Sequence, residues 1–425
     1  MGKHFCFVHC ADLHLGEPFE GLRSGDKGPW TEAISKATFT AFERVVDTAL
    51  EARADAILIS GDVYNSADHS LAAQMAFARE LYRAAQGGIE TFIIHGNHDP
   101  GDAWKADIPL PPSAHVFSSD HVESFPIMKE GDVAATVYGI SYGQNHIKDD
   151  VVKEFVRKPG DGFAIAMMHT DMAGAGSPYI PCTIDELRSQ GMDYWALGHV
   201  HTRRVAGEKP YIVYPGNTQG LSINETGPRG CYLVDVGAYG TVNLKFVETD
   251  AVRWMDMPVD ITGVTDQEEM LRQILKRRAA LKDLTGRPNI VRLIFTGRGP
   301  LHKAVASEEG QEFILQFLNE KEQFRHIFTY FSRIEDRTKP DMDLAERREL
   351  PDVTGDFLRA YDKVALLPEE EKLRTLRELA ASRPETARIG QVLSRLPDEV
   401  VLKAFERAET AGADLLAEED GNEDH

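Results

Sequence analysis

The stretch FCFVHCADLH, residues 5–14, places an aspartate and a histidine directly after a short apolar run. Aromatic and β-branched residues dominate the run, which predicts a buried strand. Asp12 and His14 lie two positions apart, and alternate residues of an extended chain point to the same side. The two side chains can therefore reach one metal ion together.

Four further short motifs follow in order, each after a strand-like run: SGDVYN at 60–65, HGNHDP at 95–100, MMHTD at 167–171 and LGHVH at 197–201. The last motif repeats the spacing of two. Because α/β folds place their sites at the ends of strands, we expect the five motifs to converge. Together they offer seven nitrogen and oxygen ligands, namely Asp12, His14, Asp62, Asn97, His169, His199 and His201.

The residue types in this set indicate a site for two metal ions. A carboxylate has two oxygens and can bridge two cations, and Asp62 follows Gly61, which lets the backbone turn sharply. Asn97 adds a neutral carbonyl oxygen. The mixture of imidazole and oxygen ligands favours Mn, Fe, Zn or Co over Ca²⁺, and Mn²⁺ is our preferred ion. Such two-metal sites hydrolyse phosphate esters.

His98 follows a ligand directly and points the other way on an extended backbone. Its imidazole is therefore free to protonate a departing oxygen, with Asp99 as the residue that orients it. We predict that these two residues take part in catalysis.

Strand-like and helical patterns alternate over residues 1–250, which predicts a layered α/β domain with two sheets. Helices are expected from Glu32 to Ala52 and from about Ser70 to Ala85. The pattern over residues 251–337 predicts a small α+β domain. The pattern over residues 338–425 is helical and charged, and it ends in an acidic tail. The C-terminal helices carry apolar positions that either fold back on the second domain or bind a partner helix.

The composition of the chain limits the classes of protein to which it can belong. The formal net charge is −21, so nucleic-acid affinity would need local basic patches such as the one at Arg203 and Arg204. The four cysteines form no pairing framework, which fits buried thiols in a reducing compartment. Neither a leader peptide nor an apolar run of membrane-spanning length is recognisable, so we expect a soluble, cytoplasmic protein without a membrane partner.

The ordered motifs resemble the calcineurin-like metallophosphoesterases, and within them the bacterial DNA-repair exonucleases of the SbcD and YhaO type. The family pattern of D-x-H, GD, GNH[DE], H and GHxH is matched throughout residues 12–201. The resemblance implies a four-layer β-sandwich flanked by helices, two divalent metal ions and DNA as substrate. It implies one metal held by Asp12, His14, Asp62 and His201, and the other by Asp62, Asn97, His169 and His199.

The resemblance also implies a role for the rest of the chain. Residues 251–337 would form a cap over the metal face, and the C-terminal segment would attach to a coiled-coil ATPase of the SMC-like kind. Some nuclease relatives carry a DNA-contacting histidine three residues after the bridging aspartate. This chain has Asn65 there, which departs from that pattern and leaves the DNA contact open.

The leading hypothesis is a Mn-dependent DNA exonuclease or endonuclease of DNA repair. One alternative is a phosphatase or phosphodiesterase that acts on a small nucleotide or another phosphoester with the same metals. The roughly 175 residues beyond the catalytic fold favour the nuclease. A catalytically dead scaffold is a second alternative, but no ligand is missing. Pairing of two copies as a homodimer stays open.

Overall fold

The computed structural model describes residues 2–20, 22, 29–65, 70–101, 106–143, 151–172, 182–320, 322, 325–381, 392 and 395–420. The chain divides into two compact units. The first comprises Met1–Pro258, Leu271–Ile294 and Glu312–Glu335, and the second comprises Val259–Met270, Phe295–Gln311 and Asp336–His425.

The first unit contains two six-stranded sheets of mixed direction. In spatial order, the first sheet consists of β12 (Val242–Glu248), β11 (Gly230–Val236), β1 (Phe5–Cys10), β2 (Ala56–Ser60), β3 (Glu90–Ile94) and β4 (Ala114–Val116). The second sheet consists of β5 (Glu123–Lys129), β6 (Asp132–Gly139), β7 (Phe163–His169), β8 (Tyr194–Gly198), β10 (Tyr211–Tyr214) and β9 (Arg204–Glu208).

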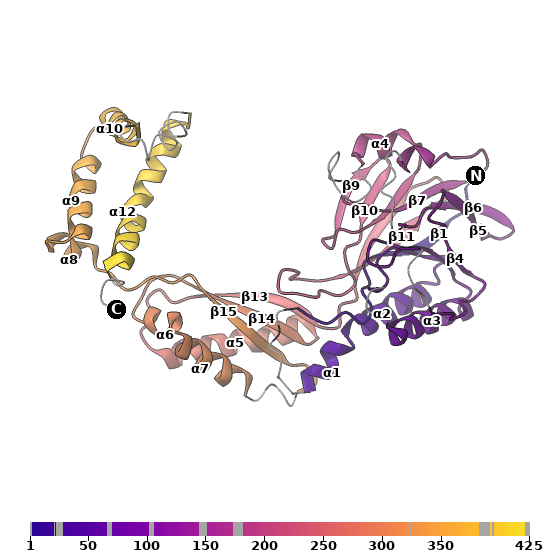
Figure 1. Ribbon diagram of the computed structural model, residues 1–425, viewed down its shortest axis with the longest axis horizontal. Coiled ribbons are helices and arrows are strands. Elements are labelled where there is room, and N and C mark those ends of the chain that lie inside the picture. The colour runs from indigo at the N-terminus through magenta and orange to yellow at the C-terminus, as the bar shows by residue number, and fades with distance from the viewer. Residues whose placement is uncertain are drawn as a thin grey trace. The chain divides into compact units, whose positions relative to one another are not determined.

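Helices α2 (Ala37–Ala52) and α3 (Leu71–Gln86) cover the outer face of the first sheet (Figure 1). They connect β1, β2 and β3, which run parallel, so they are the crossovers that parallel strands require. Alternate residues of the strands supply two different cores: Val8 packs with Phe42 beneath the helices, whereas Phe7 packs with Ile165 between the sheets.

The outer face of the second sheet is covered as well. Trp195 and Ala166 point to this side, where they pack with Phe155 and with Leu187 of α4 (Ile184–Ser189). A 3-10 helix, η2 (Val151–Glu154), contributes Val151 and Val152 to the same core. The order of helix, sheet, sheet and helix confirms the predicted four-layer α/β fold.

The predicted helix at Glu32–Ala52 is interrupted in the structure. It is divided at Lys36 into α1 (Pro29–Ser35) and α2, and Lys36 has φ −99° and ψ −2° with no side-chain cap. Trp30 of α1 is buried against Phe328 and Tyr330, which come from residues about 300 positions later in the chain. This long-range packing stabilises α1, and the local periodicity of the sequence could not show it.

A three-stranded sheet contains β13 (Arg253–Asp260), β14 (Asn289–Thr296) and β15 (Thr329–Asp336) in that order. Each of these strands begins in the first unit and ends in the second. The associated helices are α5 (Gln267–Thr285), α6 (His302–Ala306) and α7 (Glu308–Asn319). Strands and helices thus alternate over residues 253–336.

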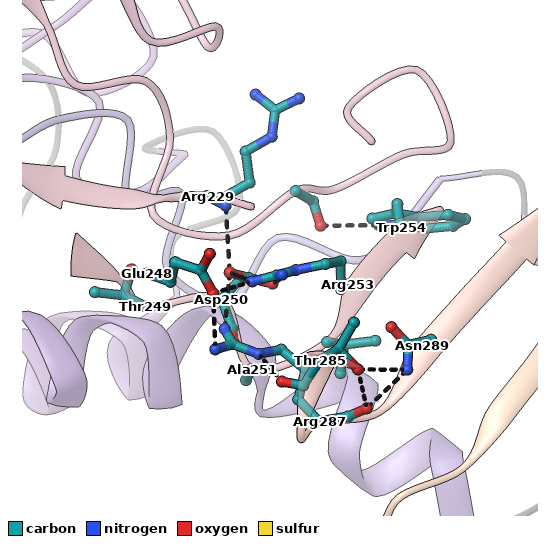
Figure 2. A network of polar contacts seen from close by, with 12 residues as sticks. Arg229, Glu248, Thr249, Asp250, Ala251, Arg253, Trp254, Thr285, Arg287 and Asn289 are labelled. Carbon is teal, nitrogen blue, oxygen red and sulfur yellow. Dashed lines mark hydrogen bonds and ion pairs between the residues drawn. The ribbon is translucent and has the colours of Figure 1, made fainter. Parts of the chain in front are cut away.

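Within the first unit, the buried carboxylate of Asp250 is a centre of polar contacts (Figure 2). It accepts hydrogen bonds from Arg253 Nε at 2.8 Å, from Arg287 Nη1 at 2.9 Å and from the backbone nitrogen of Arg229 at 3.2 Å. Arg287 also reaches Glu248. A buried charge must be paired in this way, so the network fixes β13 and the start of β14 against the end of β12.

The second unit ends in helices α8 (Leu344–Glu349), α9 (Val353–Ala365), α10 (Glu369–Ala381) and α12 (Asp398–Asp420). Helices α9 and α12 lie side by side (Figure 1), with the rings of Tyr361 and Phe405 stacked 4.4 Å apart. Leu358 of α9 and Val401 of α12 are buried. Apolar residues of the C-terminal helices therefore pack on one another.

All four cysteines are free thiols, and Cys10, Cys182 and Cys231 are buried. Among the described helices, none is long and apolar enough to cross a membrane.

Candidate metal centre

The five sequence motifs meet at one edge of the two sheets in the first unit. Asp12 follows β1, Asp62 follows β2, Asn97 follows β3, His169 ends β7 and His199 follows β8. Main-chain hydrogen bonds join the motifs to one another. The nitrogen of His199 donates to Asp12 Oδ1 at 3.0 Å, and that of His98 donates to Asp62 Oδ1 at 2.9 Å.

Four of the convergent residues have a left-handed backbone. The φ angles are 52° at Asp12, 43° at His14, 50° at Asp62 and 92° at His199. Residues with side chains adopt this region at a cost of about 1–3 kcal/mol each, and such strain is typical of functional sites. The surrounding contacts therefore hold these four side chains in directions that relaxed strand ends would not give them.

Two motif glycines are required by close packing around His169. A Cβ on Gly61, which has φ +91°, would lie 2.4 Å from His169 Nδ1. A Cβ on Gly198 would lie 1.8 Å from the carbonyl oxygen of Ser60. The glycines of the GD and GH motifs thus allow the two sheets to approach where the ligands meet.

Asp12, His14 and His201 form the first cluster, with ligand atoms within 4.8 Å of one another. The Nε2 atoms of His14 and His201 face each other at 3.1 Å. A carboxylate lies against the far nitrogen of each ring: Glu17 is 2.8 Å from His14 Nδ1, and Glu225 is 2.5 Å from His201 Nδ1. If each Nδ1 carries the proton, two lone pairs converge, as they do at a bound cation.

Asp62, His169 and His199 form the second cluster within the same limit of 4.8 Å. His169 Nδ1 lies 2.9 Å from the carbonyl oxygen of Ser60, which sets this nitrogen as the donor. Asn97 Oδ1 is 3.1 Å from His169 Nε2 and 3.0 Å from His199 Nδ1. Asn97 therefore belongs to this second cluster.

Asp62 lies between the two clusters. Its Oδ2 is 3.2 Å from His169 Nε2 and 4.0 Å from His14 Nε2. The same carboxylate thus faces one histidine of each cluster, which is the placement that a bridging ligand needs.

The charges in the centre favour bound cations. Burial alone would lower the pKa of His14, but Glu17 and Asp62 raise it to about 9. Burial likewise opposes charge on His169, and Asp62 raises its pKa to about 9. Burial would raise the pKa of Asp62, but His169 and His14 lower it. The carboxylates thus stabilise positive charge here, which divalent metal ions supply.

His98 and Asp99 differ in their surroundings. The side chain of His98 is exposed, and its ring centre lies 5.2 Å from that of His14. Asp99 is fully buried and accepts hydrogen bonds from the backbone nitrogens of Val63 and Gly96 and from His95 Nδ1. These contacts order the loop that carries His98, whereas a direct role of Asp99 on the His98 ring stays a prediction.

Glu17, Glu225 and His95 are the site residues that sequence reasoning missed. Glu17 follows His14 by three residues, and His95 precedes Asp99 by four, so their spacing was a usable signal. Glu225 lies 24 residues after His201, and only the folded chain brings the two together at 2.5 Å.

A cavity of about 860 Å³ lies elsewhere in the first unit. It is lined by the beginnings of β1, β7 and β10, including Phe5, Phe163 and Tyr211, and by none of the convergent residues. A smaller cavity of about 260 Å³ has His201 in its wall and therefore adjoins the candidate metal centre.

Comparison with known families agrees with this geometry. The model for calcineurin-like phosphoesterases matches residues 6–203, which include all the convergent motifs. A second model, for the middle domain of the metallophosphoesterase YhaO, matches residues 254–339.

Similar proteins cover much of the chain. An uncharacterized metallophosphoesterase YhaO from Bacillus subtilis is 34% identical over 80% of this chain and 83% of its own length. A DNA double-strand break repair protein Mre11 from Methanopyrus kandleri is 24% identical over 63% of this chain and 62% of its own. A subunit of the nuclease SbcCD from Escherichia coli is 22% identical, over 63% of this chain and 74% of its own.

The two candidate metal clusters agree with what this family implies, namely a phosphoester hydrolase that uses divalent metal ions. The chain belongs to the calcineurin-like metallophosphoesterases and is of the YhaO and SbcD type.

Proposed function

We propose that this protein is a DNA nuclease that hydrolyses phosphodiester bonds with two divalent metal ions, preferably Mn²⁺. One metal would be held by Asp12, His14, Asp62 and His201, and the other by Asp62, Asn97, His169 and His199. Bound together, the two ions would supply an activated water and neutralise charge on the attacked phosphate.

The observation that carries the proposal is the pair of imidazole nitrogens that face each other across the first cluster. The two Nε2 atoms are 3.1 Å apart, and a carboxylate lies near the far nitrogen of each ring, so two lone pairs converge on one point when each Nδ1 carries the proton. Asp62 Oδ2 lies beside both clusters. Two mixed nitrogen and oxygen sites that share one carboxylate fit transition-metal ions better than Ca²⁺.

Two observations support DNA as the substrate. The similar proteins include ones named as a DNA double-strand break repair protein and as a nuclease subunit. The chain also continues well beyond the catalytic fold, and we propose domains at 1–250, 251–337 and 338–425, with the second acting as a cap. Asn65 leaves open how strongly the protein acts as an exonuclease. We also propose a cytoplasmic location, which fits a role in DNA repair.

One experiment tests the proposed function directly. The purified protein is incubated with Mn²⁺ and end-labelled single-stranded, double-stranded and hairpin DNA, beside an aryl phosphodiester dye. We expect a ladder or shortened DNA together with dye hydrolysis. Dye hydrolysis without any DNA cleavage would support a phosphodiesterase of small substrates instead.

Glu225 is proposed to position His201. Its Oε2 accepts from Asn217 Nδ2 at 2.9 Å and from the backbone nitrogen of Leu221 at 2.6 Å, which leaves Oε1 for His201. Burial would raise its pKa, but His201 and the other donors lower it to about 2, so the carboxylate is charged at neutral pH. A charged, anchored acceptor of this kind fixes a metal-ligating histidine.

We therefore expect Glu225→Ala to weaken binding of one metal ion by about 10–100-fold. Titration calorimetry with Mn²⁺ measures the two affinities without any substrate. Asp235→Asn is the matched control, because Asp235 pairs with His4 at 2.8 Å outside the metal centre. Unchanged affinity for both ions in Glu225→Ala would remove the positioning role.

A partner is proposed for the C-terminal helices. The apolar residues Leu366 and Leu415 are 86% and 64% exposed, although neighbouring positions such as Leu358 are buried in the helix pair. Exposed leucines on charged helices suit a partner helix. We propose a coiled-coil, SMC-like ATPase as this partner, in line with the nuclease subunit among the similar proteins. A homodimer is also compatible with this arrangement.

Deletion of the chain after Pro340 is expected to abolish capture of such an ATPase and to leave dye hydrolysis intact. The cut preserves the backbone hydrogen bonds of Arg337 to Phe295 and of Lys339 to Gly297, both at 2.9 Å. It removes α8 to α12, and the proposed metal ligands end at His201. Pull-down with the ATPase measures the loss, and equal capture of both forms would place the partner surface elsewhere.

A further inference from the structure

Arg203 has an unusual environment for an arginine of this acidic chain. Its guanidinium lies 4.1 Å from the centre of the Phe246 ring, a cation–π contact that holds the side chain in place. Within the described ranges it forms no ion pair, whereas Arg79, Arg157 and Arg292 each pair with a carboxylate. Its positive charge is therefore ordered and makes no direct ion pair, although it lies near enough to Glu248 to lower the pKa of that carboxyl.

Arg203 lines the cavity of about 260 Å³ that also has His201 in its wall. Thr226, two prolines and Arg229 are also in its wall. A cavity of this size accommodates a phosphate group with part of a sugar. Because His201 belongs to the candidate metal centre, a group in this cavity would lie next to the scissile phosphate.

Arg229 adds a second charge to the cavity and is only 9% exposed. Its guanidinium bonds to oxygens that are not carboxylates, including Asn217 Oδ1 at 3.1 Å and the carbonyl of Glu225 at 3.2 Å. In Figure 2 the guanidinium points away from Asp250, which binds the backbone nitrogen of Arg229 instead. Two arginines that make no direct ion pair with a carboxylate thus line the cavity beside His201.

The nearby carboxylates are committed to other groups. Glu225 binds His201, Asn217 and Leu221, and Asp250 binds Arg253 and Arg287. Glu248, the carboxylate nearest in effect to Arg203, pairs with Arg253 and Arg287 as well. A cavity with this balance of charge favours an anion, and guanidinium groups suit phosphate oxygens. A substrate with a single phosphate would leave this cavity unused, but a nucleic-acid strand carries a second phosphate one nucleotide away.

We propose that Arg203, supported by Arg229, binds the backbone phosphate adjacent to the scissile one. The inference rests on the proposed function and deepens it, because it makes a polyphosphodiester strand the preferred substrate class. The Phe246 ring would hold the Arg203 guanidinium ready for the phosphate. Local charge at this cavity would then offset the formal net charge of −21.

The test measures binding of a fluorescent single-stranded oligonucleotide by anisotropy at several salt concentrations. We expect Arg203→Ala to weaken binding about tenfold and to reduce the slope of log affinity against log salt by about 0.7, the value for one single-strand phosphate contact. Arg203→Lys keeps the charge but loses the planar fork, so an intermediate loss is expected.

Arg204→Ala is the matched control. It removes the same charge from the next residue of the chain, which does not line the cavity. An equal loss in Arg203→Ala and Arg204→Ala would show a general field effect and overturn the specific contact. Both variants change exposed side chains, and equal melting temperatures would verify that they fold normally.

Oligonucleotides with one uncharged methylphosphonate, placed in turn at each position, locate the contact. At one position the wild type should lose affinity about tenfold while Arg203→Ala loses none further. Equal losses in both proteins at every position would overturn the inference. If the wild-type protein itself fails to bind or cut DNA, the proposed function fails instead, so the two failures are distinguishable.

Discussion

Replacing Asp62 with alanine is expected to abolish phosphodiester hydrolysis and to lower the bound metal from two ions per chain to one or none. Asp62 Oδ2 faces His169 Nε2 at 3.2 Å and His14 Nε2 at 4.0 Å, so it is the carboxylate placed to contact both ions. Its removal would leave two cations a few ångströms apart with no charge between them. At 4 Å and an effective dielectric constant near 20, two unit charges already repel by about 4 kcal/mol, and divalent ions repel more.

Asp62→Asn separates this effect from simple loss of packing. The amide keeps the size of the side chain, and its oxygen can still accept the hydrogen bond that Asp62 Oδ1 receives from the His98 nitrogen at 2.9 Å. It cannot supply the bridging charge, so we expect it to lose metal as the alanine variant does. Metal content by mass spectrometry and dye hydrolysis measure both variants. Two tightly bound ions with near-normal turnover in either variant would show that Asp62 is not the bridge.

Much of this centre could be predicted because its residues follow strands. Asp12 and Asp62 each come directly after a buried parallel strand, and the carboxyl ends of parallel strands meet at one edge. The spacing of two also indicated that His199 and His201 lie close together. The structure places them in different clusters, and His199 has a φ of 92°, so the chain does not continue as a regular strand there.

Glu225 and Trp30 escaped prediction because they act through distant contacts. Glu225 reaches His201 from a loop that has no strand or helix signal, and Trp30 is buried against Phe328 and Tyr330 far along the chain. Periodicity reports only which face of an element is apolar, so it cannot show which distant residue packs on that face. The same limit applied to the C-terminal helices, where Tyr361 and Phe405 pack against each other.

The position of His98 makes it a candidate acid for the leaving oxygen. Its exposed ring lies beside that of His14, with 5.2 Å between the ring centres, whereas its backbone nitrogen is bound to Asp62. Replacing His98 with alanine keeps the backbone nitrogen and hence this hydrogen bond. We therefore expect the variant to bind both metal ions normally. It should cleave DNA about 10²–10⁴-fold more slowly, because general acid–base catalysis usually contributes a rate factor of this size.

The dependence on the leaving group distinguishes proton donation from other roles of His98. An aryl phosphodiester releases a phenolate, which needs little protonation, whereas DNA releases a much more basic sugar alkoxide. His98→Ala should therefore slow DNA cleavage far more than dye hydrolysis. His4→Ala is the control for removing an exposed imidazole, because His4 pairs with Asp235 outside the centre. Equal losses on both substrates would mean that His98 serves binding or positioning, since a proton donor must matter most for the poorest leaving group.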